Sequence, residues 1–108
     1  MDWKSYYNAH KTDALSAVNL IKSGDRVVMG HAVGEPSYLI DTMVQNREAY
    51  RNVEIVHMVF MGKGEYCNPG MEKYFRHNSL FVGGTARAAI AEGRADYTPC
   101  YFSEIPHI

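Results

Sequence analysis

The chain has 108 residues, of which 46% are apolar, and its eleven basic and twelve acidic residues leave a formal net charge of −1. This length suits one domain, near the small end of those that bury a core. The apolar share excludes a disordered chain, and the balanced charge argues against nucleic acid or an anionic membrane as a partner. No apolar run is long enough to span a bilayer.

Two features predict a cytoplasmic protein. Residues 1–5 contain no apolar stretch of the kind found in a signal peptide. The only two cysteines, Cys67 and Cys100, suit free thiols in a reducing compartment. Neither CxxC nor HxxxH spacing occurs, so we expect no metal site.

The first half of the chain predicts helices around one strand. A helical turn over residues 3–7 precedes a helix over residues 12–21, which Thr12 or Asp13 would cap. Residues 26–30 are short, β-branched and apolar, which predicts a strand buried on both faces. Pro36 suits the first turn of a further helix to about residue 48. That helix has one apolar face, made by Leu39, Ile40, Met43 and Val44.

The second half predicts three more strands. Residues 53–61 are apolar on both alternating sets, and His57 interrupts one set. A glycine-bearing loop over residues 62–70 and an irregular segment over residues 71–78 precede a third strand over residues 79–82. A double-glycine turn then leads into a helix over residues 86–92. Residues 97–102 suit a fourth strand, and Ser103 would cap a final turn.

This alternation predicts an α/β fold, with a parallel sheet, helices on both faces and right-handed crossovers. Ligands in such folds bind beyond the carboxyl ends of the strands. Three loops follow predicted strands and should meet there, namely residues 30–36, 62–70 and 83–85.

The first of these loops, Gly30-His31-Ala32-Val33-Gly34-Glu35-Pro36, is the strongest candidate for a binding site. Its glycines would let backbone N–H groups approach a ligand, and the helix that follows would add positive potential. The alternative is an ordinary strand-to-helix turn, because a carboxylate such as that of Glu35 is favourable near any helix start. The glycine spacing differs from that of dinucleotide-binding turns.

The remaining candidates have weaker patterns. The turn over residues 83–87 would bind a carboxylate or phosphate, or serve as a plain tight turn. Cys67 and Cys100 have no neighbouring base that would make either one a nucleophile. Three histidines lie in or after predicted strands and could supply acid–base chemistry, although such residues are more often structural: His31, His57 and His77.

Several phrases of the sequence, in their order and spacing, resemble one family. The resemblance is to the amino-terminal part of the acetyl-CoA hydrolase/transferase family, most closely its 4-hydroxybutyrate and butyrate-type CoA-transferases, and it covers nearly the whole chain from about residue 4. The phrases are Ser23-Gly24-Asp25-Arg26-Val27-Val28, Gly34-Glu35-Pro36, Phe75-Arg76-His77-Asn78-Ser79-Leu80-Phe81, Arg87-Ala88-Ala89-Ile90, Gly93-Arg94-Ala95-Asp96-Tyr97-Thr98-Pro99 and Ser103-Glu104-Ile105-Pro106.

The resemblance implies two similar α/β domains and an exchange of CoA between an acyl-CoA and a small carboxylate. A glutamate would form first an acyl anhydride and then a CoA thioester, which splits one difficult exchange into easier steps. CoA would thus be a substrate, and no permanently bound cofactor is implied. The family's nucleophilic glutamate belongs to a carboxyl-terminal domain, outside these 108 residues.

We therefore expect no catalytic residue in this chain and no activity from the chain alone. Glu35 matches the family's amino-terminal phrase and not its nucleophile motif. We interpret Gly30, Gly34, Glu35 and Pro36 as lining the side of the cleft that receives the acyl group or carboxylate. Apolar surface left for the carboxyl-terminal domain should favour self-association, so we expect a homo-oligomer.

The sequence leaves alternatives open. A non-enzymatic α/β module that binds a small ligand or a partner explains the composition equally well. A complete small hydrolase is disfavoured, because no nucleophile–base set is visible. The acyl donor, the acceptor, and the choice between transfer and thioester hydrolysis stay open.

Overall fold

A computed structural model describes all residues from Met1 to Ile108. Its centre is a parallel sheet whose four strands are neighbours in chain order: β1 (Arg26–Val28), β2 (Val53–His57), β3 (Phe75–Ser79) and β4 (Ala95–Tyr97). The α-helices are α1 (Trp3–His10), α2 (Ala14–Val18), α3 (Ser37–Gln45) and α4 (Gly84–Ala91). The 3-10 helices are η1 (Ala32–Gly34), η2 (Arg47–Ala49), η3 (Glu65–Cys67) and η4 (Phe102–His107). The predicted α/β fold with a parallel sheet is confirmed.

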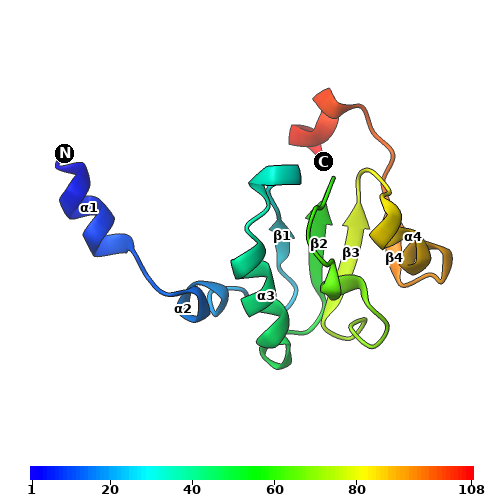
Figure 1. Ribbon diagram of the computed structural model, residues 1–108, viewed down its shortest axis with the longest axis horizontal. Coiled ribbons are helices and arrows are strands. Elements are labelled where there is room, and N and C mark those ends of the chain that lie inside the picture. The colour runs from blue at the N-terminus through cyan, green and yellow to red at the C-terminus, as the bar shows by residue number, and fades with distance from the viewer.

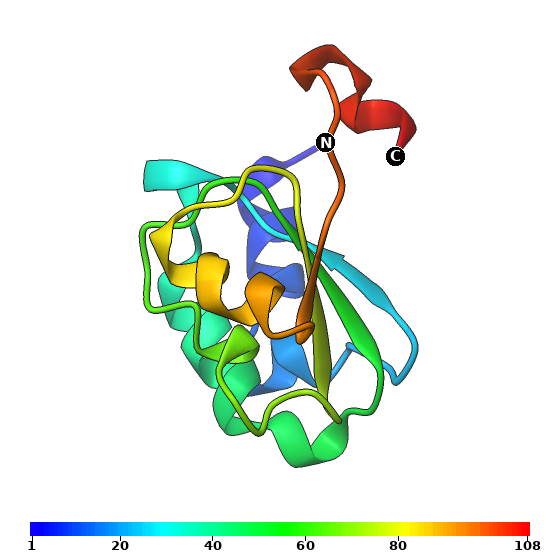
Figure 2. The same cartoon turned by 90° about the vertical axis from the view of Figure 1, so that its right-hand side faces the viewer.

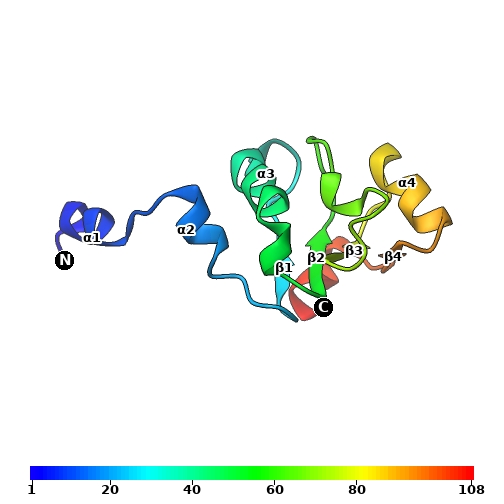
Figure 3. The same cartoon turned by 90° about the horizontal axis from the view of Figure 1, so that it is seen from below.

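The helices cover the two faces of the sheet unequally. Helices α3, η3 and α4 form a layer on one face, and η4 lies on the other side, towards the carboxyl ends of the strands (Figure 2, Figure 3). Helix α1 projects away from the sheet (Figure 1) and has no buried residue. None of the helices combines the length and the apolar character needed to cross a membrane.

Alternation along the strands determines where the core lies. One set of residues in the two central strands is completely buried: Val53, Ile55, His57, Phe75, His77 and Ser79. Apolar members of this set pack with Val18 of α2, Met43 of α3 and Tyr66 of η3 in a single cluster. The core therefore lies between the sheet and the helix layer, and two histidines point towards it.

Tyr50 ties the segment after α3 to α2. Its side chain is fully buried, and its hydroxyl donates to the Val18 carbonyl at 2.7 Å and accepts from the Asn46 amide at 3.0 Å. We expect Tyr50→Phe to lower the free energy of unfolding by about 1–3 kcal/mol, because the Val18 carbonyl loses its buried donor. Urea denaturation measures this loss. Tyr38→Phe, which changes an exposed ring, is the control, and equal effects of the two substitutions would contradict the contact.

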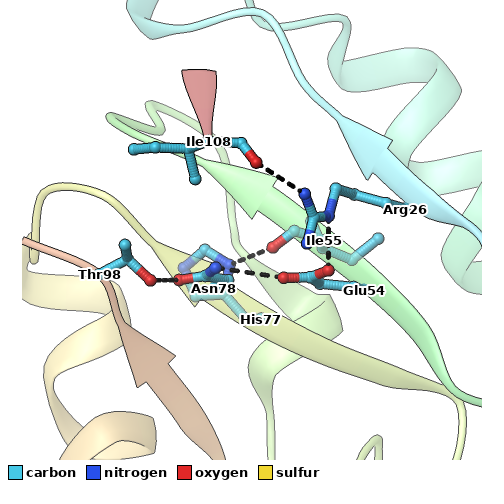
Figure 4. Close-up of polar contacts among 7 residues, drawn as sticks. All are labelled: Arg26, Glu54, Ile55, His77, Asn78, Thr98 and Ile108. Atoms are coloured by element: carbon cyan, nitrogen blue, oxygen red, sulfur yellow. Dashed lines mark hydrogen bonds and ion pairs between the residues drawn. The ribbon is translucent and has the colours of Figure 1, made fainter. Parts of the chain in front are cut away.

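Polar contacts cross the opposite face of the sheet (Figure 4). Arg26 donates to Glu54 at 2.7 Å, Asn78 donates to the other oxygen of Glu54 at 3.1 Å, and Thr98 donates to Asn78 at 2.7 Å. Arg26 also donates to the carbonyl of Ile108 at 3.1 Å, which holds the end of the chain near this face. Exposed ion pairs stabilise a fold little. These contacts instead give the polar side chains of the strands hydrogen-bond partners.

Two predicted strands lie at the wrong positions. Strand β3 covers Phe75–Ser79, so residues 71–78 are not irregular throughout and residues 79–82 are not the third strand. The polar residues in β3 have cross-strand partners, such as Asp96 for Arg76 at 2.7 and 2.8 Å. Strand β4 covers Ala95–Tyr97 instead of residues 97–102, because Pro99 has no N–H for a sheet ladder.

The boundaries of the amino-terminal helices also differ from the predictions. The turn predicted over residues 3–7 is the longer α1, Trp3–His10. The helix predicted over residues 12–21 is α2, which covers only Ala14–Val18. Asp13 caps it, as one of the two predicted caps, by accepting from the Ser16 N–H at 2.7 Å. Helix α2 ends at Val18, whose side chain packs in the core.

Four other predictions need correction. Strand β1 is an edge strand with Val28 66% exposed, so it is not buried on both faces. Strand β2 ends at His57 and does not extend to residue 61. Helix α3 ends at Gln45, and Pro36 lies at its cap position instead of its first turn. Leu39 is exposed although it was assigned to the apolar face. The helix predicted over residues 86–92 is present as α4, but it begins at Gly84, the second glycine of the predicted turn, and ends at Ala91.

Candidate functional site

The three glycine-bearing loops meet at the carboxyl ends of the strands, as predicted. Gly62 lies against the carboxylate of Glu35, so closely that a Cβ on Gly62 would come within 2.8 Å of Oε2. A Cβ on Gly64 would come within 2.9 Å of the Thr85 methyl group. The first loop therefore contacts the second, and the second contacts the third.

In the loop over residues 30–36, three backbone N–H groups already have hydrogen-bond partners within the protein. Ala32 donates to the Val59 carbonyl at 2.7 Å. Gly34 donates to the His31 carbonyl at 2.9 Å, and Glu35 donates to the Ala32 carbonyl at 3.1 Å. These three N–H groups are therefore not presented to an anion in the way that the sequence pattern suggested.

The same loop is folded tightly and carries backbone strain. A Cβ on Gly30 would lie 2.7 Å from the Gly34 carbonyl oxygen, so a side chain at position 30 would displace the loop. Ala32 has φ of +51°, in the left-handed region that costs an L residue about 1–2 kcal/mol. Strained residues of this kind cluster at functional sites.

His57, the last residue of β2, contacts the first and second of these loops. Its Nε2 is 2.9 Å from the Gly30 carbonyl oxygen, and its Nδ1 is 2.8 Å from the Tyr66 hydroxyl. A carbonyl only accepts, so Nε2 carries the proton and Nδ1 accepts from the Tyr66 O–H. Burial lowers the pKa of His57 and raises the pKa of Tyr66, so both groups are neutral at pH 7.

Other rings enclose His57. The ring centroids of His31 and Phe60 lie 5.7 and 5.2 Å from that of His57 in stacked arrangements. The ring of His77 meets that of Tyr66 edge-on at 5.3 Å. The structure thus brings together the three histidines that the sequence singled out, with His31 and His57 related by their ring faces.

The surroundings of His77 and His31 indicate structural roles for both residues. Burial lowers the pKa of His77 to about 4, so its ring is neutral at pH 7, and its Nε2 is buried without a hydrogen-bond partner. His31 is half-buried, and its Nδ1 accepts from the Met58 N–H at 3.2 Å. No group of three or more His, Cys, Asp or Glu side chains has the arrangement of a metal site.

Glu35 points inward beside His57. Its side chain is only 4% exposed, and its Oε1 lies 3.9 Å from His57 Nδ1. Its Oε2 is buried and has no hydrogen-bond partner. Because a buried carboxylate oxygen without a donor is costly, this side chain is the most unusual polar group of the site. The sequence had pointed to Glu35 and to His57 as a possible acid–base residue, but it gave no sign of Tyr66.

A pocket of about 230 Å³ lies between the start of α3 and the second loop. Its polar lining includes Glu35, Asp41, Lys63 and Glu65. Lys63 and Glu65 approach each other to 3.9 Å. The pocket adjoins the carboxyl ends of the strands, where ligands of parallel α/β folds bind.

Cys67 contributes no nucleophile to the site. Cys67 is buried in η3, and its thiol donates to the Gly64 carbonyl at 3.0 Å. Burial raises the pKa of Cys67, so the unreactive thiol form prevails at pH 7. Both cysteines are free, and Cys100 lies in the segment after β4.

Comparison with known proteins identifies the family. Residues 1–108 match the model of the acetyl-CoA hydrolase/transferase N-terminal domain. The chain belongs to the acetyl-CoA hydrolase/transferase family. The resemblance noted in the sequence is therefore confirmed over the entire chain.

Relatives within this family are named CoA transferases. The chain is 52% identical over all 108 residues to the 4-hydroxybutyrate coenzyme A transferase of Clostridium kluyveri. It is 38% identical over 88 residues, 80% of the chain, to the succinyl-CoA:acetate/propanoyl-CoA:succinate CoA transferase of Fasciola hepatica. The chain covers 25% and 18% of these relatives, so it spans a quarter of their length or less.

Solved structures show the same fold. RipA from Yersinia pestis superposes on 99% of the chain with a TM-score of 0.88 at 22% sequence identity, and 27% of that protein is covered. Its F60M variant gives a TM-score of 0.88 at 23% identity, with 99% of the chain and 27% of that protein covered. The arrangement of strands and helices is therefore also found in these larger chains, of which it makes up about a quarter.

Proposed function

We propose that these residues form the amino-terminal part of an enzyme that transfers CoA between an acyl-CoA and a small carboxylate, of the acetate, butyrate or 4-hydroxybutyrate type. The observation that carries this proposal is the 52% identity, over the complete chain, to a 4-hydroxybutyrate coenzyme A transferase. The meeting of three glycine-bearing loops beyond the strands supports it, because substrates bind at this edge of parallel sheets.

The proposed reaction proceeds through a glutamate of the enzyme. Its carboxylate attacks the acyl-CoA carbonyl, CoA leaves as thiolate, and an acyl-glutamyl anhydride forms. The thiolate then attacks the glutamyl carbonyl, which releases the first carboxylate and leaves a glutamyl-CoA thioester. The acceptor carboxylate reverses these steps, so bonds, charges and protons balance with CoA as a substrate.

We place the nucleophilic glutamate on a part of the protein beyond these residues. A nucleophile must reach the thioester carbonyl, whereas Glu35 is almost fully buried and Gly62 covers its Oε2. In this proposal Gly30, Gly34 and Pro36 line the substrate side of the cleft, and Glu35 lies beneath them.

Activity measurements on two proteins test the proposal. The full protein that contains these residues should convert butyryl-CoA and acetate to acetyl-CoA and butyrate. The 108-residue chain alone should show no exchange of CoA. No exchange by the full protein with butyryl-CoA or 4-hydroxybutyryl-CoA would refute the proposed function. Turnover by the 108-residue chain would refute the placement of the nucleophile.

Mass spectrometry locates the nucleophile directly. The full protein, incubated with excess butyryl-CoA and no added acceptor, should carry CoA on a glutamate outside residues 1–108, since the only carboxylate present to discharge the thioester is the one equivalent of butyrate that the first half-reaction releases. Digestion and peptide mapping identify the modified residue. A CoA adduct on the peptide that contains Glu35 would show that the assignment is wrong.

A further inference from the structure

Glu35 lies against two loops although its side chain makes no hydrogen bond with either. Its Oε1 lies 3.9 Å from His57 Nδ1, and Gly62 fills the space beside its Oε2. Neither solvent nor a ligand reaches Oε2 in this arrangement, because the atom is buried. Such a group is unfavourable for folding. Where a native structure keeps one, the position of the side chain has a reason other than stability.

The loop that contains Glu35 needs to be held. Ala32 has φ of +51°, and a conformation of this kind persists only where the surroundings impose it. The Ala32 N–H donates to the Val59 carbonyl, and His57 donates from Nε2 to the Gly30 carbonyl. Glu35 supplies the third constraint on the loop, because it lies against both His57 and the second loop.

Tyr66 determines which nitrogen of His57 faces the loop. Its O–H donates to Nδ1 at 2.8 Å, which leaves Nε2 as the protonated nitrogen that donates to Gly30. The orientation of the imidazole therefore depends on contacts from two sides, the Tyr66 hydroxyl in η3 and the Gly30 carbonyl in the first loop. Glu35 packs beside this ring without a hydrogen bond to it. A buried imidazole held in this way transmits the position of one loop to another.

We propose that Glu35 is a positioning residue, which acts through His57 and Gly62 to hold the Gly30–Pro36 loop in one conformation at the mouth of the cleft. The effect on the loop follows from the contacts described above. The effect on turnover rests on the proposed function.

Two substitutions separate a positioning role from a chemical one. Glu35→Gln keeps the shape of the side chain and replaces its carboxyl group with an amide, whereas Glu35→Ala removes the contacts with His57 and Gly62. If the Glu35 carboxylate forms a covalent bond with the acyl group or CoA, both variants lose CoA-exchange activity. If Glu35 only positions the loop, Glu35→Ala loses CoA-exchange activity and Glu35→Gln largely keeps it.

The first experiment uses the isotopically labelled 108-residue chain and needs no activity. Nitrogen NMR of the imidazole rings reports which nitrogen of His57 carries the proton. We expect the Nε2–H form in the wild type and in Glu35→Gln. In Glu35→Ala we expect the Nε2–H form to persist, because Tyr66 still donates to Nδ1, and the amide signals to shift across residues 30–36 and at Gly62, which Glu35 no longer contacts. Unchanged signals in Glu35→Ala would overturn the proposal.

Tyr66→Phe provides a second variant if Glu35→Ala does not fold. It removes the donor to His57 Nδ1 and leaves Glu35 Oε1 beside that nitrogen as an acceptor, so we expect a mixture of the Nε2–H and Nδ1–H tautomers. A single, unchanged Nε2–H form in Tyr66→Phe would show that Glu35 does not lie against His57 Nδ1 as described, and would overturn the proposal.

The second experiment measures CoA exchange in the full protein. Glu35→Ala should lower kcat/KM about 10- to 100-fold, as displaced supporting groups do, and Glu35→Gln should stay close to the wild type. Glu92→Gln, the same change at an exposed side chain after α4, is the matched control. Equal losses in Glu35→Gln and Glu35→Ala would mean that the carboxylate itself reacts or binds substrate. Absence of exchange in the wild type would refute the proposed function, and the NMR result would still decide the positioning role.

Discussion

Phe75→Ala should lower the free energy of unfolding by about 3–5 kcal/mol, the usual cost of removing a fully buried phenylalanine. Phe75 is 1% exposed, and its ring centroid lies 6.0 Å from that of Tyr50 and 6.3 Å from that of Tyr74. The substitution leaves a cavity between the sheet and the helix layer, which neighbouring aromatic rings fill only in part. Equilibrium unfolding in urea measures the loss.

Phe81→Ala is the matched control for this prediction. Phe81 lies in the segment that the sequence pattern assigned to the third strand, yet its side chain is 62% exposed. We expect a change of less than about 0.5 kcal/mol, as for most surface substitutions. A larger loss for Phe81→Ala than for Phe75→Ala would contradict the position of β3.

Gly64→Ala should lower the free energy of unfolding by about 2–5 kcal/mol, since two penalties combine. Gly64 has φ of +60°, which strains any residue with a Cβ. A Cβ would also come within 2.7 Å of the Phe60 ring and 2.9 Å of the Thr85 methyl group. Thermal and urea denaturation both report this loss.

Gly70→Ala separates the two penalties, because it belongs to the same glycine-bearing loop. Gly70 has φ of +92°, but a Cβ there would have no neighbour within 4 Å. Only the backbone penalty of about 1–2 kcal/mol is expected. If both variants lost the same stability, the second and third loops would not be packed as described.

The sequence pattern predicted helices and strands better in segments with regularly spaced apolar residues than in segments with polar ones. The β2 region and α4 were recognised, since their apolar spacing reflects burial that every neighbouring residue shares. Strand β3 was missed because its middle residues, Arg76 and Asn78, are polar. Their partners, Asp96 and Glu54, come from other strands, and no local pattern shows such pairing.

The candidate site was predicted in part for the same reason. The three loops were placed correctly, because the carboxyl ends of parallel strands lie at one edge of the sheet. The interruption of an apolar strand by His57 was the available signal for the centre of the site. Nothing local to Tyr66 indicated that its hydroxyl would meet His57, nine residues earlier in the chain.

The sequence by itself determined the family, the alternation of helices and strands, and the loops that form the site. These properties follow from local spacing and from motifs that stand in one stretch of chain. Only the tertiary structure decided that the loop over residues 30–36 uses its own N–H groups, that Glu35 turns inward, and that His57 donates to Gly30. Such contacts join residues that are distant in sequence, and the packing of the whole sheet determines their geometry.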